Sequence, residues 1–405
     1  MKKISPLVLV VIGSWLNVSS QINTWTQVSS LPSDTRQWAS CFSMGDKIYV
    51  GIGGSLLLSP KYYDFWVYNV SSDAWTQKAD FPVDLAQAAS FSINGKGYIA
   101  CGYTAANKLY EYDPVADTWT ERDTLPASMS RDEAVGFSIG SFGYVCCGDN
   151  YGASYHDLWR YDPATDSWLQ MADFPGEQRN GLVAFSIGGK AYAGTGWADS
   201  GFKRDFYEYD PATDIWTSVA DFPGTKRHAA VAFSIMCNEL EGRGYVGLGI
   251  DSSGFTQDFY EYNPYTDTWW QVADFAGLPR ARLVGASAGT AGYIGTGYVS
   301  GGVVDNDFWK YVPEFCNVGT VIDDATKTAN GIRVINDAEH GELKIVTDQP
   351  SASVELFDVA GRKIFSEFFV TPRKEFTVST SSFTEEIYFI QIDRKFVSKV
   401  FISRQ

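Results

Sequence analysis

Histidine is scarce in this chain, which has three of them in 405 residues. The patterns that build common active sites are missing as well. There is no GxSxG or HExxH, no CxxC or zinc-spaced Cys/His cluster, and no phosphate-binding glycine loop followed by a helix. These absences exclude the usual serine hydrolases, zinc peptidases and nucleotide-binding enzymes, and the sequence predicts neither a metal nor another cofactor.

Positive charge is also in short supply. The 32 Lys and Arg residues are outnumbered by 48 Asp and Glu, which gives a net charge of −16. Long-range attraction to nucleic acid or to an anionic membrane needs the opposite balance. We therefore expect no nucleic-acid partner, and the acidity is typical of a soluble exported protein.

Long apolar runs are absent too. The apolar segment Leu7–Leu16 is shorter than the roughly 18–20 residues that a membrane span needs. A lysine pair precedes it and small residues end at Ser20, which is the pattern of a secretory signal peptide. We expect residues 1–20 to be removed and the protein to be a secreted or cell-surface monomer without a membrane span.

Six cysteines leave the disulfide question open. Cys237 and Cys316 lie in loops and can pair in an exported protein, but sequence does not fix the connectivity. Four others lie in apolar, strand-like segments, where we expect small buried hydrophobic residues rather than disulfides; they are Cys41, Cys101, Cys146 and Cys147.

What the sequence does contain is an internal repeat. The stretch YDPATDSWLQMADFPGEQRNGLVAFSIGGKAYAGTG at 161–196 is followed from Tyr209 by YDPATDIWTSVADFPGTKRHAAVAFSI. A fixed period of this kind predicts a repeat architecture. Its marker is a tryptophan that recurs about every 50 residues, namely Trp25, Trp75, Trp119, Trp168, Trp216 and Trp269.

Each repeat reads as four short strands. The first is rich in small residues (GLVAFSI), the second begins with tyrosine (YAGTG), and the third alternates large aromatic and polar residues (DLWRYD). The fourth begins at the recurring tryptophan. Between the third and fourth strands, Asp162, Pro163 and Asp166 are typical turn residues. Small residues suit strands crowded around an axis, and aromatic residues suit the wider space between sheets.

Counting the strands predicts how the repeats close. The first three strands occur six times, but the first copy of the fourth strand, at Trp25, precedes every complete repeat, and no tryptophan follows DFWKYV, which contains Trp309. The economical solution is a ring in which the amino-terminal strand completes the last sheet and removes an exposed edge. The sequence predicts an all-β, six-bladed β-propeller over residues 22–315.

These repeats resemble the kelch repeat, whose pattern is an arginine, an apolar strand, a tyrosine strand that ends in a glycine doublet, then a tyrosine and a spaced tryptophan. The first repeat alone keeps the doublet, as Gly53-Gly54. Some kelch propellers have a galactose-oxidase-like central domain with copper, which needs two histidines around one metal. Here His156 and His228 fall in different repeats, so we expect no copper.

Residues 316–331 are polar and patternless, as in a linker. Residues 332–405 contain strand-like segments that predict a small β-sandwich, and VELFDVAGRKIFSEF with EIYFIQI resembles the sorting domain of the type IX secretion system. Asn336-Asp337 and Ile387 depart from that pattern. The resemblance implies export across the outer membrane of a Bacteroidetes-type bacterium, with the secretion machinery as a partner; the alternative is an ordinary binding sandwich.

One polar position recurs in register just before the first strand of the repeat. The second repeat has Leu85 there, and the other five have an arginine. If these side chains reach the rim of the central channel, they form a cationic ligand-binding funnel, as the kelch resemblance also implies. The alternative is that each bonds to loop carbonyls or to acidic residues of a neighbouring blade. The five are Arg36, Arg131, Arg179, Arg227 and Arg280.

Two residues break the repeat near this position. His228 follows Arg227, and Glu133 lies two residues after Arg131, so both can reach the same mouth and act as a catalytic acid/base pair. A lone histidine and a lone glutamate at strand starts are more often surface residues. His156 occupies a turn position, and His340 lies in the terminal domain.

Two functions fit these features. The first is a non-catalytic propeller that binds an unknown protein or glycan through its central face, since loops on a rigid ring suit binding. The second is suggested by the resemblance, because some secreted six-bladed kelch propellers are sialic-acid mutarotases. In that case Arg179 or Arg227 holds the sugar carboxylate, and Glu133 or His228 moves the proton.

Overall fold

The computed structural model describes residues 23–57, 59–104, 107–150, 152–236 and 242–313, and in the C-terminal part 328–329, 332–337, 342–357, 363–379, 386–392 and 395–402. Residues 1–20, Cys237, Cys316 and His340 therefore lie outside the described residues. Within the described part, no helix has the length and apolarity that a membrane crossing requires.

Each repeat forms one antiparallel four-stranded sheet, or blade, as the alternation of small and aromatic residues predicts. Blade 1 consists of β2 (Ser40–Met44), β3 (Lys47–Gly51), β4 (Phe65–Asn69) and β5 (Ala74–Lys78). Blade 2 consists of β6 (Ala89–Ile93), β7 (Lys96–Ala100), β8 (Leu109–Asp113) and β9 (Thr118–Arg122). Blade 3 consists of β10 (Val135–Ile139), β11 (Phe142–Cys146), β14 (Leu158–Asp162) and β15 (Ser167–Met171).

The second half of the ring repeats this plan. Blade 4 consists of β17 (Val183–Ile187), β18 (Lys190–Gly194), β21 (Phe206–Asp210) and β22 (Ile215–Val219). Blade 5 consists of β23 (Val231–Met236), β24 (Gly242–Gly247), β27 (Phe259–Asn263) and β28 (Thr268–Gln271). Blade 6 consists of β30 (Val284–Ala288), β31 (Ala291–Val299), β32 (Val303–Val312) and the amino-terminal β1 (Thr24–Val28), with β29 (Arg280–Ala281) beside β31.

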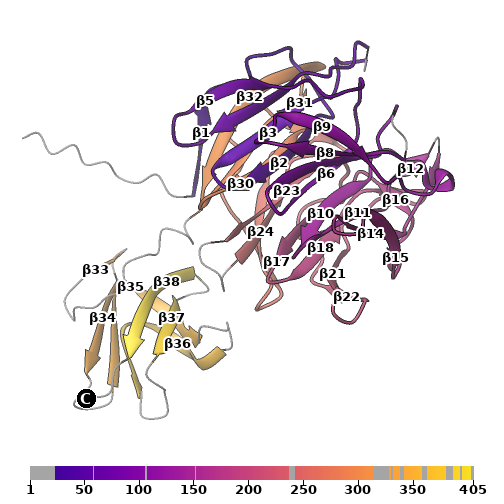
Figure 1. Ribbon diagram of the computed structural model, residues 1–405. Helices are drawn as coiled ribbons and strands as arrows, with labels where there is room; N and C mark the ends of the chain where they lie inside the picture. The colour runs from indigo at the N-terminus through magenta and orange to yellow at the C-terminus, as the bar shows by residue number, and fades with distance from the viewer. Residues whose placement is uncertain are drawn as a thin grey trace, which may run out of the picture.

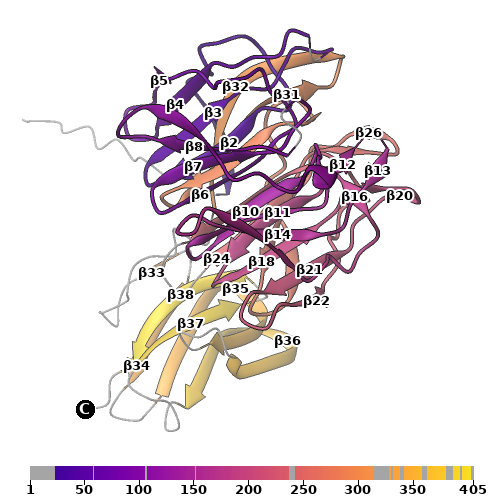
Figure 2. The same cartoon turned by 45° about the vertical axis from the view of Figure 1, so that its right-hand side comes forward.

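The blades close into a ring around their first strands. Contacts run from β2 to β6, β10, β17, β23 and β30 and back to β2. As a result, the first repeat lies beside the last one, as the indigo and orange strands show in Figures 1 and 2. Small residues let the sheets approach: a Cβ atom on Gly143 would lie 2.1 Å from the ring of Phe91 in the preceding blade.

The turn between the third and fourth strands ties each blade to the one before it. Tyr161 donates a hydrogen bond to Asp166 (2.7 Å), and Asp166 accepts the Asp123 amide of blade 2 (3.0 Å). Trp168 then donates its indole N–H to the Asp123 carbonyl (2.9 Å). The turn carboxylate and the tryptophan are thus an inter-blade clamp as well as a local motif. The same set recurs with Asp73, Asp117, Asp214 and Asp267.

The clamp of blade 6 is supplied by the amino terminus. Asn23 accepts the Tyr311 hydroxyl and the Ala273 amide, both at 3.0 Å, and the Trp25 indole donates to the Ala273 carbonyl. β1 pairs with β32 so that Trp25 lies opposite Tyr311. Trp25 is buried against Phe259 at a ring distance of 5.0 Å. The predicted closure by the amino-terminal strand is confirmed.

Short hairpins extend several blades at the end of the ring where the second strand leads into the third. They are β12 (Asp149–Asn150) with β13 (Ala153–Ser154), β16 (Arg179–Asn180) with β19 (Trp197–Ala198) and β20 (Gly201–Phe202), and β25 (Ile250–Asp251) with β26 (Gly254–Phe255). Figure 2 shows β13, β20 and β26 at this common end. A single turn of 3-10 helix, Ala127–Met129, lies in the connection that leads into blade 3.

The C-terminal strands form one hydrogen-bonded sheet in the order β33-β34-β35-β37-β38, with β36 also paired to β35. Their bounds are β33 (Thr328–Ala329), β34 (Ile332–Asp337), β35 (Glu342–Phe357), β36 (Lys363–Ser379), β37 (Glu386–Ile392) and β38 (Lys395–Ile402). β33 falls within the segment expected to be a linker. Leu343, Val354, Leu356 and Ile390 are fully buried in this unit. Its expected sandwich layering and its sorting role stay predictions.

Candidate functional site

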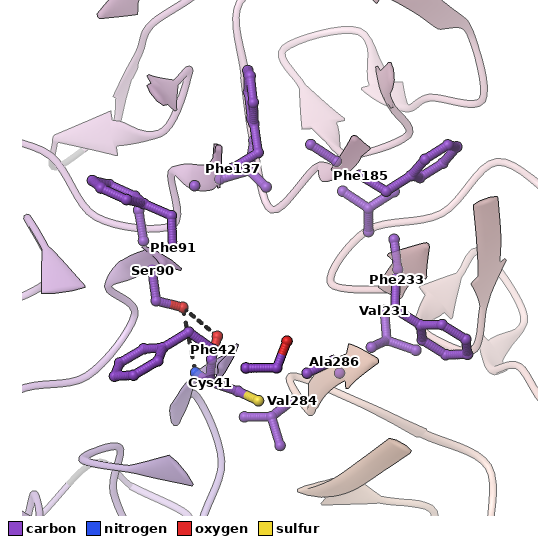
Figure 3. A pocket seen from close by; sticks show the side chains of 18 of the residues that line it. Cys41, Phe42, Ser90, Phe91, Phe137, Phe185, Val231, Phe233, Val284 and Ala286 are labelled. Atoms are coloured by element: carbon purple, nitrogen blue, oxygen red, sulfur yellow. Dashed lines mark hydrogen bonds between the residues drawn. The ribbon is translucent and has the colours of Figure 1, made fainter. Parts of the chain in front are cut away.

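A central channel runs through the ring. It holds a cavity of about 310 Å³ that is lined by the first strands of all six blades. Figure 3 looks into this cavity and shows the phenylalanine rings of these strands pointing away from it, into the blades. The channel wall itself is made of small residues, and at one level each blade contributes one serine: Ser43, Ser92, Ser138, Ser186, Ser234 and Ser287.

At one end of the channel the backbone closes a ring of its own, which we call the mouth ring. It has one residue from each blade, and the amide of each donates to the carbonyl of the one before it at 2.9–3.2 Å, back to the start. All six have φ between 48° and 60°. That conformation costs a non-glycine residue about 1–2 kcal/mol, so the surrounding fold must hold it. The mouth ring is Trp38, Gln87, Glu133, Gly181, Ala229 and Arg282.

The side chains of the mouth ring break the sixfold symmetry. Together with the single layer of alanine and leucine residues that follow them in the sequence, they line a pocket of about 70 Å³, which we call the mouth pocket. Gly181 and Ala229 carry the smallest side chains of the mouth ring, and the imidazole of His228 lies over Gly181. By the order of the ring, Glu133 and Arg282 lie across the pocket from each other. A carboxylate and a guanidinium thus line one small cavity.

The structure brings the two predicted acid/base residues together. His228 Nε2 lies 3.0 Å from Glu133 Oε2, and about 15% and 17% of their side chains are exposed. The other oxygen of Glu133 accepts the Gln87 side-chain amide at 2.7 Å. His228 reaches Glu133 across Gly181, where a Cβ atom would lie 2.3 Å from the imidazole. A glycine is therefore required at this ring position, and the pair is positioned for proton transfer.

Arg282 supplies the positive charge of the mouth pocket. Its guanidinium lies 5.5 Å from the Trp38 ring and 5.5 Å from the Tyr298 ring, and it donates to the Gln37 side-chain oxygen at 3.0 Å. Among the residues that the structure describes, no carboxylate lies within ion-pair distance of it. Arg282 Nε and Gln87 Oε1 are both buried without a hydrogen-bond partner. Both atoms are closed to solvent, so a molecule in the pocket reaches them only if the side chains move.

The five repeated arginines have a different environment. Arg131 is buried and donates to both oxygens of Asp157 at 2.6 and 2.8 Å and to the Cys147 carbonyl at 2.9 Å. Burial alone would raise the pKa of Asp157, but the hydrogen bonds and charge of Arg131 hold that pKa below its usual value. Arg179–Asp205, Arg227–Asp258 and Arg280–Asp307 pair in the same way, and Arg36 donates to one oxygen of Asp64 and to Ser33.

The sequence of blade 2 indicates that these arginines have a structural role. It has Leu85 in place of the arginine, and it also has Lys108 in place of the aspartate that precedes the third strand. The two members of the pair are lost together, which is expected if each exists to satisfy the other. The geometry therefore favours the alternative of bonds within the fold, although each aspartate belongs to the arginine's own blade and not to a neighbouring one. A ligand-binding role for these five arginines stays a prediction.

A pair of aspartates lies beside the mouth ring. Asp132 and Asp149 face each other across an isolated antiparallel bridge, with backbone hydrogen bonds of 2.8 and 2.9 Å. Burial and then the neighbouring Asp149 raise the pKa of Asp132 to about 7. The pair therefore shares a proton below about pH 7. In the described residues, no group of three His, Cys, Asp or Glu side chains is placed to hold a metal ion.

The remaining candidates are less informative. His156 is partly exposed, 3.7 Å from Asp173, as suits a turn residue. Cys101, Cys146 and Cys147 are buried free thiols, and Cys41 is a free thiol in the channel wall. Burial raises the pKa of the Cys41 thiol well above its usual value, so it stays protonated and unreactive.

Comparison with known proteins agrees with this architecture. No family model matches the chain. The N-acetylneuraminate epimerase of Pasteurella multocida is 29% identical over 143 residues, which are 33% of this chain and 35% of that protein. Kelch-like protein 35 of Mus musculus is 26% identical over 159 residues, 38% of this chain and 26% of its own length. The solved structure of YjhT has a TM-score of 0.57 and 18% identity, covering 69% of this chain and 96% of that chain.

The chain is similar to kelch-repeat proteins over about a third of its length and has the fold of a β-propeller. It spans about a third or less of the length of these two curated relatives. The likeness to YjhT, at 18% identity, concerns the fold.

Sequence reasoning missed Arg282, Trp38 and Gln87. The signal was present, because each mouth-ring residue stands two positions after the arginine position of its kelch repeat, where Glu133 had already been noted. When the six repeats are aligned, the residue at this position differs in every repeat, whereas the position two residues earlier is arginine in five of the six. A column that varies within a strict repeat marks the positions that are free to specialise.

Proposed function

We propose that the protein binds an acidic sugar in the mouth pocket and serves as a carbohydrate-binding propeller. The observation that carries this proposal is the guanidinium of Arg282, which faces the pocket beside Trp38 and has no carboxylate partner among the described residues. Arginine binds carboxylates through two parallel hydrogen bonds. An indole offers a flat apolar surface on which the C–H face of a sugar ring can pack. An acidic sugar uses both.

The size of the pocket supports a ligand that enters only in part. A cavity of about 70 Å³ holds roughly two water molecules at the volume of liquid water. That space fits a carboxylate with its attached carbon, while the sugar ring rests on the surrounding loops. The guanidinium of Arg282 then pairs with the carboxylate. The name of one relative, N-acetylneuraminate epimerase, indicates that a similar chain acts on a sugar acid.

A titration series checks the binding proposal. We expect N-acetylneuraminate to bind to the purified protein and neutral galactose to bind far more weakly, as measured by calorimetry or saturation-transfer NMR. Arg282→Gln should weaken N-acetylneuraminate binding about 10- to 100-fold, the effect of losing hydrogen bonds to a charged group. Arg204→Gln, which removes an exposed arginine paired with Asp221, is the matched control. Equal binding of both sugars, or no effect of Arg282→Gln, would reject the proposal.

The Glu133–His228 pair favours a second candidate, the interconversion of anomers of a free acidic sugar. One member takes the proton from the anomeric hydroxyl while the other delivers a proton to the ring oxygen. The ring C–O bond breaks as the carbonyl forms, and closure on the other face reverses both transfers. Protons and electrons balance without an oxidant or a metal. The 3.0 Å contact allows the pair to share the proton between turnovers.

Proton NMR exchange between the anomers of N-acetylneuraminate measures this reaction directly. If the pair is catalytic, Glu133→Gln and His228→Asn should each slow the exchange about 100-fold or more, while Arg204→Gln leaves it unchanged. If the unmodified protein gives no acceleration, the second candidate is rejected and the binding proposal is unaffected.

We also propose that the protein is exported, with residues 332–405 as the sorting signal. Support comes from the signal-like residues 1–20 and from the terminal segments that resemble a type IX sorting domain. In a host with that machinery, removal of residues 332–405 should leave the propeller in the periplasm, and the full chain should appear outside the cell. Fractionation with antibody detection reads the result, and export of the truncated chain would reject the sorting role.

A further inference from the structure

A second circle of residues surrounds the mouth ring, and we call it the collar. Each collar residue is bonded through its backbone to the residue that directly precedes a mouth-ring residue. Asn180, for example, pairs with Trp197, and Ala281 pairs with Tyr298. The collar therefore lies one step outside the mouth pocket all the way round. Its members are Gly54, Tyr103, Asp149, Trp197, Ile250 and Tyr298.

Every second collar position is aromatic. Tyr103, Trp197 and Tyr298 come from blades 2, 4 and 6, so they stand at alternate positions around the mouth. Tyr103 and Trp197 expose 44% and 42% of their surface, which is unusual for residues so large. Tyr298 lies against Arg282 and against Phe255. The rim of the mouth pocket thus carries separate aromatic surfaces.

Trp197 is the best placed of the three to extend the site. It stands on the β19–β20 hairpin, where the ring of Phe202 meets it edge-on at 4.6 Å and 81°. Its partner Asn180 adjoins Gly181, the ring position that His228 crosses. Trp197 is therefore a supported, exposed aromatic on the His228 side of the pocket, two ring positions away from Arg282. A rigid aromatic side chain loses little conformational entropy on binding.

We infer that the ligand is an oligosaccharide whose acidic terminal sugar enters the mouth pocket and whose next sugar packs on Trp197. This inference rests on the proposed function. The mouth pocket holds only one edge of a sugar, so the rest of the ligand must lie on the collar. A free monosaccharide leaves Trp197 uncovered, whereas a second ring on the His228 side covers it.

The test compares two probes, N-acetylneuraminate and the trisaccharide 3′-sialyllactose. We expect the trisaccharide to bind the unmodified protein about tenfold more tightly. Trp197→Ala should remove most of that gain and leave the affinity for the monosaccharide unchanged. Trp197→Tyr, which keeps an aromatic face, should restore part of it. Tyr265→Ala is the matched control, because Tyr265 is an exposed aromatic in a turn at the other end of the blades.

The outcomes distinguish failure of the proposed Trp197 contact from failure of the proposed acidic-sugar site. If the two probes bind equally, or if Trp197→Ala weakens both by the same factor, the extended site is rejected while the acidic-sugar site stands. If neither probe binds the unmodified protein, the proposed function fails and takes this inference with it. Melting curves of each variant identify loss of fold, and Trp197→Tyr gives an independent reading if Trp197→Ala unfolds.

Discussion

At the scale of single residues, arginines at two nearby positions of one repeat have different roles. Arg280 is buried against Asp307, whereas Arg282, two positions on, faces the mouth pocket with no carboxylate partner among the described residues. Both carry a full charge. They differ in how much water each has lost. A fully buried guanidinium is stable only with a charged partner, whereas a half-buried guanidinium at a pocket keeps enough solvent contact to stay unpaired until a ligand binds.

The first prediction concerns the buried pairs. Arg179→Leu should lower the free energy of unfolding by about 3–5 kcal/mol, since it leaves Asp205 near the interior without its partner. The double change Arg179→Leu with Asp205→Lys copies the Leu85 and Lys108 of blade 2 and should recover at least half of that loss. Urea unfolding of the single and double variants measures both. A double variant less stable than Arg179→Leu alone would show that blade 2 owes its stability to something else.

The second prediction concerns pH. Because the pKa of Asp132 is raised to about 7, the folded protein holds more protons than the unfolded chain between about pH 4 and pH 7. The free energy of unfolding therefore falls as pH rises through this window. Asp132→Asn removes the repulsion with Asp149 and should raise stability at pH 8 by about 1–2 kcal/mol, a value reduced for partial exposure, with a smaller effect at pH 5.

Urea unfolding at the two pH values checks this result. Asp199→Asn, a change at an exposed carboxylate, is the control and should give the same small effect at both. A stabilisation by Asp132→Asn that does not depend on pH would contradict the shared proton.

At the scale of elements, the amino-terminal strand is a working part of the last blade. Asn23 takes the place of the turn aspartates, and Trp25 takes the place of the recurring tryptophan. Removing residues 22–31 should strip a buried tryptophan and expose the edge of β32, lowering the free energy of unfolding by about 3–5 kcal/mol and promoting association. Melting temperature and light scattering report the two effects. A monomeric truncation with an unchanged melting temperature would contradict this role.

The elements were also where the sequence was most informative. Six registered tryptophans and the displaced first copy at Trp25 sufficed to predict the blades and their closure, because each blade buries the same residues against its neighbours. The destination of Arg131 could not be predicted, since a column of identical residues does not reveal whether it points into the channel or into the blade. Arg282 escaped notice because a single arginine carries no repeat signal.

At the scale of the whole molecule, the ring is closed by non-covalent contacts between β1 and β32. Thr24 lies opposite Val312, just as Ser167 lies opposite Asp162 in blade 3. A three-residue linker, Pro-Ala-Thr, placed between Val312 and Asn23 therefore recreates the turn of the other blades. This linker makes circular permutants of the propeller possible.

We predict that the position of the new ends decides the stability of such permutants. A chain opened between Thr213 and Asp214 moves the natural closure into blade 4 and should keep the melting temperature. A chain opened between Asp221 and Phe222 leaves every blade covalently whole but the ring unsealed, and it should melt lower, because no strand crosses the gap. Equal melting temperatures, measured by calorimetry, would show that contacts between blades alone hold the ring.

The mouth ring has a wider implication. Its six backbone hydrogen bonds are made whatever side chain each position carries, as Trp38, Gly181 and Arg282 already demonstrate. Apart from Gly181, which the imidazole of His228 restricts to glycine, these positions separate recognition chemistry from folding. Single substitutions at the other five positions can therefore change the chemistry of the opening while the backbone ring is kept.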